Sequence, residues 1–188
     1  MEMITEKVDD DMGYEAINAD NRVHEPSIWG ELKSLGIKLV VTTAVVIITF
    51  TFFYGLQRNT DLSMFPMVKD GDLVLFYRLD KDYAIGDLLL LEFQGERQVR
   101  RVVAKAGDSV DISEHGLIVN GSLQQELGIY EKTYGYAEGI VFPVTVGSGE
   151  IFVLGDARQN ATDSRVYGSV SAKDTYGKVI TIIWRRNL

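Results

Sequence analysis

Ser63 is the residue whose type and position most directly suggest chemistry. It begins the segment Ser63-Met64-Phe65-Pro66, six residues after an uncharged, mostly apolar run from Leu39 to Gln57. A run of about 20 residues, each rising about 1.5 Å, spans a hydrocarbon core of about 30 Å. The absence of Lys, Arg, Asp and Glu from the run favours a membrane helix over a buried core helix. A serine just beyond such a helix would lie where a membrane-embedded substrate can reach it.

The composition excludes several other kinds of chemistry. The 188 residues carry a net charge of -8, which argues against a nucleic-acid-binding surface. There is no cysteine, so the chain has neither a disulfide nor a thiol nucleophile. The two histidines, His24 and His115, lie on opposite sides of the apolar run, which disfavours a histidine metal site or a Ser-His-Asp triad. We therefore expect no metal and no cofactor.

The chain divides into three parts. Residues 1–35 contain nine acidic and three basic side chains without a regular apolar period, which predicts a solvated, disordered tail, with an acidic docking arm as the alternative. Residues 36–57 are the predicted membrane helix, and residues 58–188 form one further domain. Lysine or arginine flanks the apolar run on both sides, so charge alone does not set its orientation.

From Gly71 onward, short β-rich runs alternate with glycine and aspartate. Asn120-Gly121 is a hairpin signal, because both turn residues accept positive φ. Residues 124–140 are polar and rich in glycine and tyrosine, which predicts an excursion from the core. The pattern favours an all-β barrel or folded sheet over a βαβ sheet. The predicted strands cover residues 73–77, 88–93, 98–104, 109–113, 117–119, 141–146, 150–154 and 178–184.

Four short motifs follow the apolar run in a fixed order. They are the Ser63 segment; Gly71-Asp72-Leu73-Val74; Val99-Arg100-Arg101-Val102-Val103 with Gly107-Asp108; and Gly155-Asp156-Ala157-Arg158 with Asp163-Ser164-Arg165 and Gly168. In this order, behind a single apolar run, they resemble the type I signal peptidases, which are membrane-anchored serine endopeptidases that remove signal peptides from secreted preproteins. The resemblance implies a mainly β, signal-peptidase-like domain on the outer face of the plasma membrane, behind a single anchor and a cytoplasmic tail.

The catalytic dyad that the resemblance implies is incomplete. Ser63 matches the family's nucleophile, but Arg100 occupies the position of the lysine that serves as general base. Burial can deprotonate a lysine, whereas the pKa of arginine stays above about 12. Arg100 therefore cannot take the proton of Ser63, and we expect it to form a salt bridge with Asp61 or Asp163.

Further positions depart from the family or match it. Ala161 replaces a serine that orients the lysine, Ala157 replaces an asparagine, and Asp61 stands where the family has glycine or serine near the oxyanion hole. A carboxylate there would oppose a developing oxyanion. We expect Ser63, Arg100, Asp61 and Ala161 to meet around one surface cleft. Two sets match the family: the structural ion pair of Asp163 and Arg165, and the substrate-groove residues Met64, Phe65 and Pro66.

None of the alternative bases is convincing. Lys105 lies five residues beyond Arg100 and would face the opposite side of a regular strand, unless a bulge intervenes. Asp61 is close to Ser63 in sequence but is a weak base unless strongly desolvated. His115 falls on a predicted hairpin tip.

Two functions remain open at this stage. The first is a working signal peptidase with an unusual base or a water-assisted Ser63. The second is a catalytically impaired, pilus-associated homologue that binds secreted or pilin-like subunits and assists their assembly. Both imply the same partners, namely preproteins or pilin-like subunits with signal peptides and the lipid bilayer, without nucleic acid.

The predicted topology is testable. Protease added to intact cells or right-side-out vesicles should degrade the domain of residues 58–188 and spare residues 1–35. Immunoblotting with one antibody against the N-terminal end and one against the C-terminal end shows which of the two parts is degraded. Degradation of residues 1–35 alone would overturn this orientation.

Overall fold

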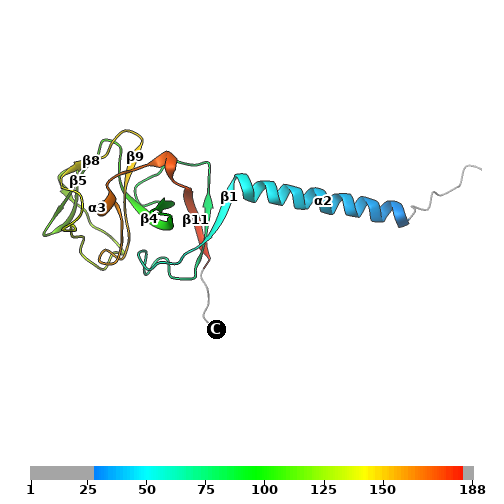
Figure 1. The fold of residues 1–188 in the computed structure, drawn as a ribbon, viewed down its shortest axis with the longest axis horizontal. Helices are drawn as coiled ribbons and strands as arrows, with labels where there is room; N and C mark the ends of the chain where they lie inside the picture. Colours follow the sequence, from blue (N-terminus) through cyan, green and yellow to red (C-terminus); the bar gives the residue numbers. More distant parts are fainter. Residues whose placement is uncertain (1–27, 184–188) are drawn as a thin grey trace, which may run out of the picture. The chain divides into compact units, whose positions relative to one another are not determined.

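The computed structural model describes residues 28–183 as one long helix and a mainly β domain (Figure 1). The mainly β fold and the single N-terminal apolar helix that the sequence predicts are thus confirmed. The helical elements are α2 (Ile28–Phe52), α3 (Ser164–Tyr167) and the 3-10 turn η1 (Ala172–Asp174). The strands are β1 (Tyr54–Arg58), β2 (Leu73–Tyr77), β3 (Leu88–Phe93), β4 (Glu96–Lys105), β5 (Ser109–Ser113), β6 (Gly116–Val119), β7 (Ser122–Leu123), β8 (Val144–Thr145), β9 (Glu150–Leu154), β10 (Val170–Ser171) and β11 (Gly177–Ile183).

Helix α2 fits a single-pass membrane anchor. Its 25 residues rise roughly 38 Å, enough to cross a hydrocarbon core of about 30 Å, and none of its side chains is buried in protein. The helix differs from the prediction at both ends. It begins at Ile28, so residues 28–35 of the predicted tail are helical, while residues 1–27 lie outside the described residues.

The predicted helix was too long at its C-terminal end. It ends at Phe52, and residues 54–57, predicted to be helical, belong to β1. The reason is a long-range pairing: Tyr54–Arg58 runs antiparallel to Leu73–Tyr77 and gains a full ladder of backbone hydrogen bonds. Gly55 allows this pairing, because a Cβ there would overlap the ring of Phe76.

The larger sheet has seven antiparallel strands in the order β1-β2-β11-β3-β4-β9-β10. The C-terminal strand β11 thus inserts between β2 and β3, and β4 lies between β3 and β9. Two apolar clusters cover this sheet, one around Met64, Val74 and Val99 and the other around Leu89 and Val153. The central place of β4 makes it a rigid support for the side chain of Arg100.

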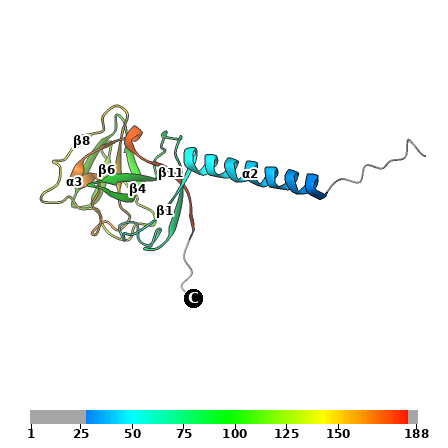
Figure 2. The same ribbon diagram turned by 45° about the vertical axis from the view of Figure 1, so that its right-hand side comes forward.

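The smaller sheet has four antiparallel strands in the order β7-β6-β5-β8. Within the β domain its strands β5 and β8 lie at the end away from β1 (Figures 1 and 2). Asn120 and Gly121 have φ values of 53° and 76° and turn β6 into β7, which confirms the predicted hairpin. A third apolar cluster joins this sheet to β9 through Val110 and Phe152.

The residue ranges of the longer predicted strands after Gly71 agree with those in the structure, and the differences lie at short elements. The run 141–146 pairs only at Val144–Thr145, and the prediction missed β7, β10 and the one-turn helix α3. Residues 124–140 contain neither helix nor strand, as predicted for an excursion.

Gly177 marks the point where β11 enters the sheet, and its replacement tests this architecture. Its φ is 150°, and a Cβ there would overlap the carbonyl oxygen of Tyr77 on β2. We expect Gly177→Ala to lower the free energy of unfolding by about 3 kcal/mol or more. The control Gly149→Ala places a Cβ in open space at φ 75° and should cost about 1–2 kcal/mol. Denaturant unfolding followed by circular dichroism measures both, and equal losses would contradict the assigned packing of β11.

Candidate active site

Ser63 lies in the turn between β1 and β2 and is 5% exposed. Its backbone N–H donates to Oδ1 of Asp61 at 3.1 Å, and its carbonyl oxygen accepts the N–H of Ala157 at 2.9 Å. Within residues 28–183 its hydroxyl makes no hydrogen bond. The backbone of Ser63 is therefore fixed on both sides, while the hydroxyl has no partner within the fold.

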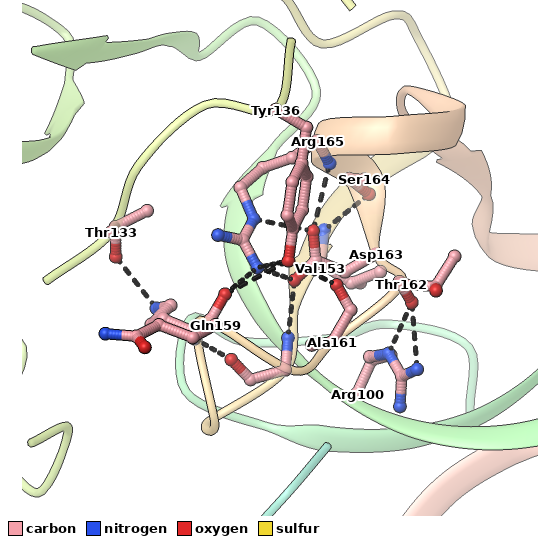
Figure 3. Close-up of polar contacts among 12 residues, drawn as sticks. Arg100, Thr133, Tyr136, Val153, Gln159, Ala161, Thr162, Asp163, Ser164 and Arg165 are labelled. Carbon is pink, nitrogen blue, oxygen red and sulfur yellow. Dashed lines mark hydrogen bonds and ion pairs between the residues drawn. The ribbon is translucent and has the colours of Figure 1, made fainter. Parts of the chain in front are cut away.

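Arg100 projects from β4 into a fully enclosed position, with 1% of its side chain exposed. Nε and Nη2 donate to the carbonyl oxygen of Thr162 at 3.0 and 2.8 Å, a contact visible in Figure 3. Nη1 donates to the carbonyl oxygen of Val99 at 2.6 Å and to Oδ2 of Asp61 at 3.3 Å. Of the two predicted ion-pair partners, Asp61 is therefore the one that Arg100 contacts.

Asp61 joins these two residues. One carboxylate oxygen accepts the N–H of Ser63, and the other accepts Nη1 of Arg100. Its side chain is 32% exposed, so water reaches part of the group. The carboxylate of Asp61 occupies the backbone N–H of Ser63 and brings a negative charge beside this serine. An acyl-transfer site, by contrast, needs free N–H donors for an oxyanion.

Ala161 and Gly155 complete the immediate surroundings of Ser63. A Cβ added to Gly155 would overlap the Cβ of Ala161 and lie 3.3 Å from the Cβ of Ser63. The structure thus brings Ser63, Arg100, Asp61 and Ala161 together, as expected. They do not surround an open cleft, however, because Ser63, Arg100 and Ala161 are each at most 5% exposed.

Asp163 and Arg165 form a buried ion pair that shapes the turn after β9 (Figure 3). Nη2 and Nε of Arg165 each lie 2.8 Å from an oxygen of Asp163. The same carboxylate accepts the N–H of Gly155 at 3.0 Å and caps α3 by accepting the N–H of Arg165. The pair therefore fixes both ends of the loop that carries Ala161 and Thr162.

Tyr136 is a positioning residue that the sequence did not reveal. Its hydroxyl lies 2.9 Å from the carbonyl oxygen of Ala161, and its ring packs 4.5 Å from the guanidinium of Arg165 (Figure 3). Arg158, also buried, pairs with Glu126 and donates to the hydroxyl of Thr133. The only sequence signal was the glycine- and tyrosine-rich composition of residues 124–140, which gives no partner.

No substitute base emerges among the described residues. Lys105 pairs with exposed Asp82, and His115 is 72% exposed beside Glu114, so neither contacts Ser63. Burial raises the pKa of the Tyr167 hydroxyl, and the charge of nearby Arg100 only partly opposes this rise. The buried hydroxyl of Tyr167 makes no hydrogen bond in the described part of the chain, whereas its backbone N–H donates to the carbonyl oxygen of Asp163 at 3.2 Å. A phenol with a raised pKa is protonated at neutral pH, so it does not serve as a base.

The three predicted groove residues differ in exposure. Met64 is fully buried in the cluster with Val74 and Val99, so it supports the surface from below. Phe65 is 52% exposed, and Pro66 lines a cavity of about 520 Å³. Of these three residues, Phe65 and Pro66 are therefore the ones exposed at the surface.

Comparison with known proteins shows the family of this chain. The family model described as "Signal peptidase, peptidase S26" matches residues 32–184, and the chain belongs to this family. It is 30% identical over 149 residues to signal peptidase I T of Bacillus subtilis, covering 73% of this chain and 74% of that protein. It is 26% identical over 170 residues to a probable signal peptidase I-1 of Synechocystis sp., covering 82% and 84%. A signal peptidase I structure from Enterococcus faecalis aligns with 53% of this chain and 97% of its own, at 24% identity and a TM-score of 0.44.

Removing the carboxylate of the buried ion pair should be costly. Asp163→Ala leaves Arg165 buried without its counter-charge, and we expect a loss of about 3–5 kcal/mol in the free energy of unfolding. Chemical denaturation of the full chain in detergent measures the loss. Asp82→Ala, which removes an exposed partner of Lys105, is the control and should change little. A similar loss in both variants would contradict the supporting role of Asp163.

Proposed function

We propose that this protein binds the cleavage region of signal peptides on exported preproteins at a membrane surface, and that its own serine site is catalytically impaired. Membership of the signal peptidase family supports the substrate class. Ser63, at the family's nucleophile position, marks where the cleaved bond would lie. The observation that carries the impairment is the chain of contacts from Ser63 through Asp61 to Arg100.

The contacts of Arg100 argue against proton transfer. A general base needs a free lone pair within hydrogen-bonding reach of the serine hydroxyl. The guanidinium has none, and its donors face two carbonyl oxygens and one carboxylate, all of which stabilise its charged form. The two oxygens of Asp61 accept hydrogen bonds from the backbone N–H of Ser63 and from Arg100, and within residues 28–183 neither contacts the Ser63 hydroxyl.

The membrane arrangement is part of the proposal. Helix α2 serves as the single-pass anchor in the plasma membrane, with the N-terminal residues in the cytoplasm and the β domain outside. Ser63 lies 11 residues after Phe52, the last residue of α2, and five of the residues between them form β1. A short connection of this kind keeps the site within reach of a segment emerging from the bilayer.

A working signal peptidase is the second candidate. The retained Ser63 favours it, because its hydroxyl makes no hydrogen bond within residues 28–183 and is free to react. The named relatives are themselves signal peptidases. A pilin-like partner stays a prediction from the sequence and falls within the same class of exported subunits.

Restoring the family residues separates the two candidates. The triple variant Arg100→Lys, Ala161→Ser, Asp61→Gly supplies an amine that burial can deprotonate, a hydroxyl to orient it and a free N–H at Ser63. We expect it to cleave a signal-peptide substrate about 10²–10⁴ times faster than wild type. Cleavage is measured by mass spectrometry on purified protein in detergent.

The faster cleavage expected of the triple variant must depend on Ser63. The control is the triple variant with Ser63→Ala added, which should cleave no substrate above background. If the wild type already cleaves the substrate and the triple variant is no faster, another residue must act as the base. Lys105 would then be the first residue to replace.

A further inference from the structure

A cavity of about 520 Å³ lies beside the serine site and plays no part in the chemistry described above. Three of the segments that form the site continue into its wall: Pro66 and Met67 follow Ser63, Arg101 to Val103 follow Arg100, and Asp156 follows Gly155. The cavity therefore lies beside the serine site, although Ser63 and Arg100 are not among its lining residues. The rest of its lining is Ile85, Gly86, Leu117, residues 124–130 and Arg158.

The charges in this lining cancel in two ion pairs. Arg101 binds Asp156 through two hydrogen bonds of 2.8 and 2.6 Å, and Arg158 pairs with Glu126. The other lining residues are uncharged and mostly apolar, among them Met67 at 46% and Ile85 at 57% exposure. Such a surface favours an uncharged apolar occupant over an acidic or a basic one.

The wall formed by residues 124–130 is held in place before any ligand binds. The carboxylate of Glu126 accepts hydrogen bonds from Arg158 and, at 2.6 Å, from the hydroxyl of Thr133. That hydroxyl in turn accepts Nε of Arg158 at 2.8 Å. A preformed wall lowers the ordering cost of binding.

The size of the cavity indicates which part of a peptide it takes. Small side chains just before a cleaved bond need shallow pockets, whereas 520 Å³ is the size of a pocket for a larger ligand. The apolar segment further upstream in a signal peptide belongs to the bilayer. The segment after the cleavage position is the part left free to enter.

We propose that this cavity binds the first residues of the mature part of an exported protein, those just after the cleavage position, and that it prefers apolar side chains there. This inference rests on the proposed function, because it needs a signal peptide bound across Ser63. It adds a second anchoring point, which would hold an uncleaved preprotein at the site.

Three peptides test the inference on the full chain in detergent, in a Ser63→Ala background so that none is cleaved. All share one signal-peptide cleavage region. The first ends at the cleavage position, the second continues with four residues containing leucine and phenylalanine, and the third continues with serine and glycine. Fluorescence polarisation gives each Kd. We expect the second peptide to bind about tenfold more tightly than the other two.

A matched pair of variants locates the effect. Ile85→Glu places a charge in the lining and should remove the gain of the second peptide, with binding of the first unchanged. Leu79→Glu changes a side chain of similar exposure, 61% against 57%, outside the lining, and should keep the gain.

Each other outcome has a definite meaning. Equal binding of all three peptides would overturn this inference and leave the proposed function standing. If Ile85→Glu and Leu79→Glu both remove the tighter binding of the second peptide, this inference is also overturned, because the tighter binding would then not come from the cavity. Failure of all three peptides to bind would overturn the proposed function and this inference with it.

Discussion

The ion pair between Asp61 and Arg100 is the interaction on which the site depends. A guanidinium buried as deeply as that of Arg100 costs several kcal/mol unless a counter-charge accompanies it. Asp61 supplies that charge, and among residues 28–183 it is the acid paired with Arg100. The residues at positions 61 and 100 are therefore linked: the buried guanidinium of Arg100 requires an acid nearby, and the same acid accepts the N–H of Ser63.

The frame around this contact is intact. Asp163 and Arg165 hold the loop after β9, Gly155 leaves room for Ser63 and Ala161, and Tyr136 fixes the carbonyl oxygen of Ala161. The absence of a hydroxyl at position 161 is consistent with a site that holds no amine to orient, since the guanidinium bonds to the carbonyl oxygen of Thr162 instead. The structure thus keeps the backbone frame around Ser63, and Arg100 and Asp61 determine which proton donors and acceptors lie beside it.

The sequence predicted those parts of the fold that local patterns determine. Strands such as β2, β3, β5 and β9 combine apolar runs with glycine-aspartate or glycine-glutamate turns, and their positions agree with the prediction. Strand β1 was missed because its residues continue the uncharged run of the helix, and only the distant strand β2 makes them extended. The contacts of Tyr136 and Glu126 join residues 25 to 32 positions apart without any periodic signal. The resemblance to the family pointed to Ser63 and Arg100 and left Asp61 and Asp163 as alternative partners of Arg100. Only the fold shows that Asp61 contacts both residues.

The most direct test of the central claim is one comparison on the unaltered chain. Purified wild-type protein in excess over a preprotein, followed for a single turnover, shows whether Ser63 hydrolyses a bound substrate. The account predicts that the preprotein binds and that wild type and Ser63→Ala form product at the same background rate. Efficient cleavage by wild type that disappears in Ser63→Ala would contradict it, because a base would then be acting on Ser63 despite Arg100 and Asp61.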